Sequence, residues 1–70
     1  MYDHTQLRTL RDFLGWSIPE FVEKLKSVKL EVSESTIGNW EAGDTTPDAD
    51  KLAVIAALFG VGIERFYPNQ

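Results

Sequence analysis

The fold of this chain is decided by residues 32–43, Val32-Ser33-Glu34-Ser35-Thr36-Ile37-Gly38-Asn39-Trp40-Glu41-Ala42-Gly43. Ser33 is a preferred residue for the N-terminal cap of a helix, and Gly43 is typical of a C-terminal cap. Ile37 and Trp40 lie three residues apart, which places both on one face of a helix. The stretch therefore predicts a short helix with an apolar inner face and a polar outer face.

Another helix is predicted directly before this stretch. Ser17 and Glu20 match the capping box, in which each side chain satisfies the backbone amide of the other, and Pro19 is tolerated in a first turn. We expect this helix to end between Lys26 and Lys29. The residues on its inner face are Phe21, Val22, Leu25 and Val28.

Residues typical of helix caps also occur toward both ends of the chain. Asp3 is the expected cap of a first helix, which Gly15 ends. Asp48 begins a further helix that ends at Gly60, and a short last helix is expected before Pro68. The residues of these helices expected on inner faces are Leu7, Leu10, Leu14, Leu52, Ile55, Ala56 and Phe59, and the short last helix holds Ile63.

Helices with short connections, and no strand pattern, predict an all-α fold, a compact five-helix orthogonal bundle. We expect one domain over residues 1–70, with the helix-turn-helix proper at about 17–43. Phe66 and Tyr67 either close its core or form the face of a dimer. The chain has no cysteine, no long apolar run and no signal-peptide pattern. We therefore expect a cytoplasmic protein without disulfides, metal sites or membrane spans.

Three stretches together resemble a known family. They are Gly15-Trp16-Ser17 with Glu20-Phe21, residues 32–37 with 40–43, and Pro47 with Leu52-Ala53 and Leu58-Phe59-Gly60-Val61. Over about residues 5–67 the sequence resembles the lambda-repressor-like helix-turn-helix family, of the Cro/CI or XRE type. The resemblance implies that the second helix crosses the DNA backbone and that the third enters the major groove of double-stranded DNA.

The resemblance also implies roles for individual residues. It implies a structural ion pair between Arg11, near the end of the first helix, and Glu41, which lies among outward-pointing helix carbonyls and needs a cationic partner. It places DNA contacts on the third helix and beside it. With the lysines near the turn added, the expected DNA-binding residues are Ser17, Ser33, Glu34, Ser35, Thr36, Gly38, Asn39, Lys26 and Lys29.

Two departures from the family pattern change the surface that would face DNA. Ile18 stands where the family usually has a glutamine that bonds a phosphate, although Ser17 and the amides beside it can still hold one. The turn after Leu25 is longer than in the family. We expect the added residues to extend the second helix by a turn and then loop back, with Val28 or Leu30 tucked under.

Charge is the largest departure. Between Leu30 and Asp50 the chain has no lysine or arginine. The same stretch holds six acids, Glu31, Glu34, Glu41, Asp44, Asp48 and Asp50. The whole chain has a formal net charge of −4, so it binds polyanions well only if its cations gather on one face.

Two functions are consistent with these features. The first is a sequence-specific DNA-binding transcriptional regulator, of the repressor type found in prokaryotes and phages, acting as a homodimer. The alternative is a protein-interaction module with the same fold and weak or lost DNA binding, whose acidic surface meets a basic protein partner. No catalytic constellation or phosphate-binding loop stands out and His4 is isolated, so we expect neither an enzyme nor a cofactor.

Overall fold

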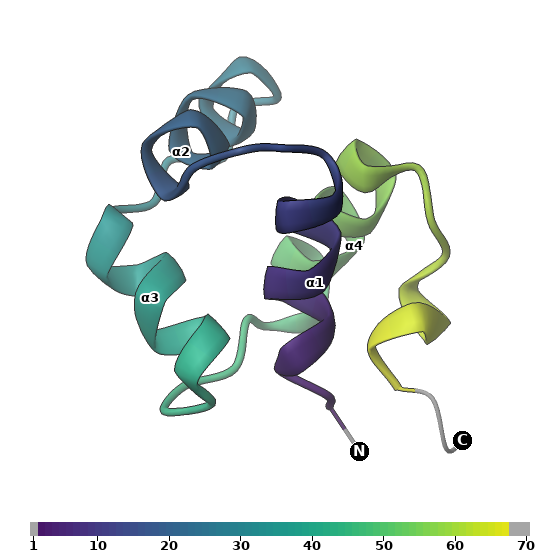
Figure 1. The fold of residues 1–70 in the computed structure, drawn as a ribbon. Helices are drawn as coiled ribbons and strands as arrows, with labels where there is room; N and C mark the ends of the chain where they lie inside the picture. The colour runs from purple at the N-terminus through teal and green to yellow at the C-terminus, as the bar shows by residue number, and fades with distance from the viewer. Residues whose placement is uncertain (1, 68–70) are drawn as a thin grey trace.

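The computed structural model describes residues 2–67, which fold into four α-helices followed by a 3-10 helix (Figure 1). The helices are α1 (Thr5–Phe13), α2 (Ile18–Ser27), α3 (Glu34–Ala42) and α4 (Ala49–Phe59), and the 3-10 helix is η1 (Ile63–Phe66). No strand occurs in these residues. The all-α fold class is therefore confirmed, whereas the expected count of five helices is not, because the fifth element is a 3-10 turn.

The last predicted helix is a single 3-10 turn, because only four residues separate Gly62 from Tyr67. Its hydrogen bonds join residues three apart. The Arg65 N–H donates to the Gly62 carbonyl at 3.0 Å, and the Tyr67 N–H donates to the Glu64 carbonyl at 3.0 Å. Such short pieces are the usual form of a 3-10 helix. Pro68, the expected end of this helix, lies outside the described residues.

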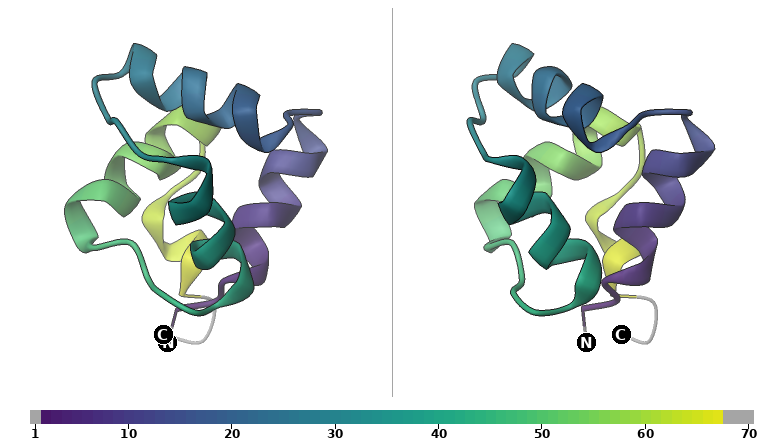
Figure 2. Two further views of the ribbon diagram at one scale, coloured as in Figure 1. Left: turned by 90° about the vertical axis from the view of Figure 1, so that its left-hand side faces the viewer. Right: turned by 60° about the vertical axis from the view of Figure 1, so that its left-hand side comes forward.

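The five elements enclose one apolar core. α2 lies across one end of the bundle, and α3 lies beside α1. In the view of Figure 1, α4 lies behind α1. Figure 2 turns the molecule so that α3 faces the viewer. Every element contributes to the core, whose members are Leu7, Leu10, Phe21, Leu25, Ile37, Trp40, Leu52, Ile55, Ala56 and Phe66. Phe66 therefore closes the core, and Tyr67 packs against it partly buried.

Three of the helices begin at the predicted caps. The Ser17 hydroxyl accepts a hydrogen bond from the Glu20 N–H at 3.2 Å, and the Glu20 carboxylate accepts one from the Ser17 N–H at 3.0 Å. Ser33 caps α3 and Asp48 caps α4, each by accepting from the N–H three residues on. These bonds satisfy amides that the helix itself leaves without partners.

The start of α1 differs from the prediction. His4, not Asp3, occupies the N-cap position. The Asp3 carboxylate accepts instead from the N–H and the hydroxyl of Thr5, at 3.0 and 2.6 Å, and these bonds lower the pKa of Asp3. His4 Nδ1 lies 2.9 Å from the Glu41 carbonyl oxygen. The residues before α1 therefore brace the C-terminal end of α3.

Two residues expected on inner faces are exposed instead. Leu14 is 40% exposed and Val28 is 45% exposed. Each is the C-cap residue of its helix, where the chain leaves the helical path and the spacing rule for the inner face stops applying. Ile63, on the short η1, is 38% exposed. Leu30, rather than Val28, packs partly buried against the core after α2.

α2 ends at Ser27, within the expected range between Lys26 and Lys29. The chain reverses at Lys29, which has a φ of 66°, the one positive value among the described non-glycine residues. The Leu30 N–H then donates to the Leu25 carbonyl at 2.9 Å, closing the helix in the way usually associated with glycine. Lysine is strained in this conformation because its Cβ crowds the backbone.

Lys29→Gly is expected to raise the free energy of unfolding by about 1 kcal/mol, because glycine adopts the left-handed conformation without that strain. Such a gain raises the melting temperature of a domain of this size by about 4–8 °C, which circular dichroism resolves. Lys29→Ala is the matched control, since it removes the same charge and keeps a Cβ. An equal gain in both variants would show that the charge, and not the backbone, limits stability.

Candidate nucleic-acid interface

The outer face of α3 carries small and polar side chains in one line. This outer line consists of Ser35, Gly38, Asn39 and Ala42. Their spacing puts them on one side of the helix, and each is at least partly exposed. Ile37 and Trp40 anchor the opposite side in the core. A Cβ placed on Gly38 would meet no atom within 4 Å, so the centre of the line is open to an incoming surface.

The predicted contact residues at the start of α3 are already engaged in its cap. The Ser33 hydroxyl accepts from the Thr36 N–H at 3.1 Å and lies 2.9 Å from the Thr36 hydroxyl. Glu34 is exposed in the first turn, where the helix dipole favours an acid. Ser35 and Asn39 remain, within residues 2–67, as the polar side chains of this face that are not committed to the cap.

A groove beside α3 joins that helix to α1 and to the start of α2. It has a volume of about 380 Å³, and its lining residues are Arg8, Arg11, Ile18, Gly38, Glu41 and Ala42. Ile18 brings the first turn of α2 to the groove, directly after Ser17. The outer line of α3 and the beginning of α2 thus meet on one face, which is the arrangement a helix-turn-helix needs to dock on a duplex.

Arg11 and Glu41 form a bidentate ion pair in this groove, and the two side chains are only 10% and 9% exposed. Arg11 Nε and Nη2 donate to the two carboxylate oxygens of Glu41 at 2.7 and 3.1 Å, and Nη1 donates to the Trp16 carbonyl at 2.6 Å. The hydrogen bond and the charge of Glu41 raise the pKa of Arg11 above its ordinary value. The ion pair links α3 to α1, and its hydrogen bonds hold the Arg11 guanidinium within the protein.

The N-terminus of α2 already holds a carboxylate. In the capping box, Glu20 Oε1 accepts the Ser17 N–H, and hydrogen bonding to Ser17 lowers the pKa of Glu20. Glu20 is therefore ionised at neutral pH. A phosphate approaching this helix end would meet that charge, whereas an uncapped end would offer it open amides. The cap that begins α2 thus competes with the phosphate contact expected at Ser17.

Glu20→Gln is expected to raise the affinity for duplex DNA about fivefold at low salt, because glutamine keeps the capping box and removes the charge. Fluorescence anisotropy with a labelled duplex of mixed sequence measures the change. Glu64→Gln, on η1, is the control for the same loss of charge elsewhere on the surface. Similar gains from both variants would mean that net charge alone governs binding.

The lysines near the turn lie at the opposite end of α2 from Ser17. α2 has ten residues and so spans about 15 Å. Lys24 Nζ lies 5.5 Å from the centre of the Trp16 ring, which is within cation–π range. Lys26 Nζ lies 4.0 Å from the carboxylate of the residue three positions earlier. Lys26 and Lys29 are both exposed, but the structure does not bring them together with Ser17.

Sequence reasoning missed two residues of this face. Arg8 lines the groove from α1, with a side chain that is 69% exposed and 3.5 Å from the Asp12 carboxylate. Arg8 lies one helical turn before Arg11, and this spacing could have indicated that both side chains face the same surface. Ala42 extends the outer line seven residues after Ser35, which the helical period also indicates.

The charges around the interface are mostly negative. The acids of the 31–50 stretch that stand exposed are Glu31, Glu34, Asp44, Asp48 and Asp50. Glu41 is neutralised by Arg11. Arg8 is the exposed cation of the groove lining.

The family comparison agrees with this geometry. A family model described as helix-turn-helix, of the XRE or lambda-repressor-like type, matches residues 7–66, which cover most of α1 and every later element. The chain belongs to this family of DNA-binding regulators. No curated protein and no solved structure matches it. In the described residues, no helix is long and apolar enough to cross a membrane, and no cluster of side chains could hold a metal ion.

Proposed function

We propose that this protein is a sequence-specific transcriptional regulator that reads the DNA major groove with α3. The outer line of α3 is the observation that supports the proposal most directly. Serine hydroxyls bond base edges, asparagine pairs with adenine through two hydrogen bonds, and an alanine methyl packs against the thymine methyl. Membership of the helix-turn-helix family supports the same docking of α3.

Phosphate contacts follow from the same docking. Arg8 faces the phosphates beside the groove, and Lys26 and Lys29 reach those near the turn. Three contacts give a slope of about −3 when log affinity is plotted against log salt. A homodimer on two half-sites one helical turn apart doubles the contacts and steepens the slope to about −5. We therefore propose a dimer as the form that occupies an operator in the manner of a repressor.

Binding to duplex DNA at two salt concentrations tests the proposal. Anisotropy at about 50 mM salt should show binding to a duplex of mixed sequence, and the affinity should fall steeply by about 200 mM. A selection of bound sites from random duplexes should then return a palindrome, which reports the dimer. Absence of binding even at low salt would overturn the DNA-binding proposal for this chain.

Arg8→Gln is expected to weaken binding to every duplex severalfold and to reduce the magnitude of the salt slope by about 1, because one phosphate contact is lost. Anisotropy titrations over a salt series measure both quantities. Arg65→Gln is the matched control, since it removes the same chemical group from η1. Equal effects of the two variants would contradict the assignment of Arg8 to a phosphate.

A second candidate function, a protein-interaction module with weak or lost DNA binding, is favoured by one observation. Five exposed acids surround α3 and the loop after it, and the 31–50 stretch supplies no cation to balance them. Such a surface attracts a basic protein partner as strongly as it repels phosphates. Binding to a lysine-rich peptide that Glu34→Lys weakens, together with no binding to DNA at low salt, would establish this function instead.

A further inference from the structure

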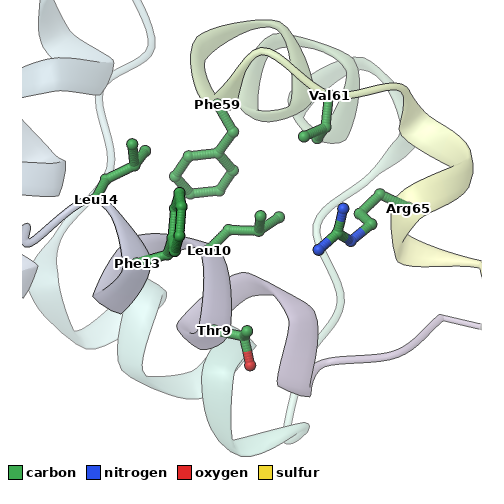
Figure 3. Close-up of a pocket in the computed structure, with 7 residues that line it drawn as sticks. All are labelled: Thr9, Leu10, Phe13, Leu14, Phe59, Val61 and Arg65. Atoms are coloured by element: carbon green, nitrogen blue, oxygen red, sulfur yellow. The ribbon is translucent and has the colours of Figure 1, made fainter.

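An apolar pocket lies on the side of α1 opposite the groove. It has a volume of about 310 Å³ and lies between the end of α1, the end of α4 and η1 (Figure 3). Its main lining residues are Leu10, Phe13, Leu14, Phe59, Val61 and Arg65. Arg8 and Arg11 line the groove, whereas Thr9 and Phe13 line the pocket, so α1 separates the two hollows.

Two large apolar side chains at the mouth of the pocket are exposed to solvent. Phe13 is 84% exposed and Leu14 is 40% exposed. Phe59 forms the inner wall, since its ring stacks on Phe21 at 5.2 Å and packs against Trp16 at 5.8 Å. A fixed wall beside an aromatic ring that stands out into solvent is typical of a surface that binds a macromolecule.

A cation stands at the edge of this pocket. Figure 3 shows the Arg65 side chain extending from η1 toward Leu10, and Val61 lines the pocket beside it. Arg65 Nε donates to the neutral Gln6 side-chain oxygen at 3.1 Å, and within residues 2–67 the guanidinium is in no ion pair. An arginine beside an apolar surface favours an occupant that is apolar and negatively charged.

We propose that this pocket is a docking site for an acidic amphipathic helix of another protein. The partner helix places an apolar side chain between Phe13 and Phe59 and a carboxylate on Arg65. The choice of another protein over a second copy of this chain rests on the proposed function, since a copy seated in the pocket would lie on the side of α1 opposite the groove beside α3. Since the pocket and the groove lie on opposite sides of α1, the partner can bind whether or not DNA is bound.

A pair of synthetic helical peptides tests the proposal. The probe is a capped peptide of about four turns with leucines spaced three and four apart and glutamates flanking them, and its twin carries lysines in place of the glutamates. Amide NMR shifts of the full chain should saturate with the glutamate peptide and cluster around Leu10, Phe13 and Val61. The glutamate peptide should bind at least about tenfold more tightly than the lysine peptide.

Variants of the two exposed residues complete the test. Arg65→Glu should reverse the preference between the peptides, and Phe13→Ser should weaken both by at least about tenfold, while Lys24→Glu on α2 leaves the preference unchanged. Circular dichroism checks that each variant is folded. Shifts that do not saturate, shifts that cluster elsewhere, or an unreversed preference in Arg65→Glu would overturn the proposal. A dimer that sedimentation shows to depend on Phe13 would overturn it in favour of a second copy.

Discussion

Arg11→Ala is expected to lower the free energy of unfolding by about 3–5 kcal/mol, because it leaves Glu41 as a buried charge without its partner. It also removes the donor of the 2.6 Å bond to the Trp16 carbonyl. A domain of 70 residues has a total stability of about 4–10 kcal/mol, so the variant should lose a large fraction of it. Urea titration followed by tryptophan fluorescence measures the loss.

Two comparisons separate the ion pair from other causes. Arg8→Ala removes an exposed arginine from the same helix and should change stability by no more than about 0.5 kcal/mol. The double variant Arg11→Met with Glu41→Met should recover part of the loss, since no charge is then left unpaired. A double variant as unstable as Arg11→Ala would mean that packing around the groove, and not the charge, carries the effect.

Asn39→Ala is expected to lower the affinity for the preferred DNA site by about 1–3 kcal/mol, or about 5- to 150-fold. Its side chain lies at the centre of the outer line of α3, where the bases of a major groove would face it. Affinity for a duplex of mixed sequence should stay nearly constant, because phosphate contacts are untouched. Anisotropy with the selected site and with a mixed duplex gives both values.

Thr9→Ala is the control for this prediction, since Thr9 is an exposed residue on the pocket side of α1. It should leave both affinities unchanged. If Asn39→Ala weakens the selected site and the mixed duplex by the same factor, Asn39 supports the helix or the phosphate contacts and does not read a base.

The features that depend on neighbours in the chain could be predicted from the sequence. The capping box of Ser17 and Glu20 and the caps at Ser33 and Asp48 are set by residues three apart, and the structure has them at the predicted places. The buried positions of α3 follow from helical spacing in the same way. Family resemblance supplied the pairing of Arg11 with Glu41, which are thirty residues apart and share no local pattern.

The rest depended on where helices stop and how they pack. Leu14 and Val28 fit the apolar period, but each falls one residue beyond its helix, where the chain turns away from the core. Arg8 joins the groove beside α3 only because α1 packs against that helix. The sequence did predict Glu20 as a cap. The repulsion between the Glu20 carboxylate and a phosphate could not be predicted, because it depends on the start of α2 lying at the same groove as α3.

α1 is the shared wall of the groove and of the apolar pocket, and this makes the two hollows thermodynamically linked if either occupant displaces the helix. Arg11 connects α1 to Glu41 of α3 through two hydrogen bonds, so a displacement of α1 would also act on α3. Linkage is reciprocal, so the factor by which a pocket ligand changes DNA affinity is the factor by which DNA changes affinity for that ligand. Binding of the partner to α1 would then change the affinity for DNA, and the fraction of operator sites bound would depend on the concentration of the partner.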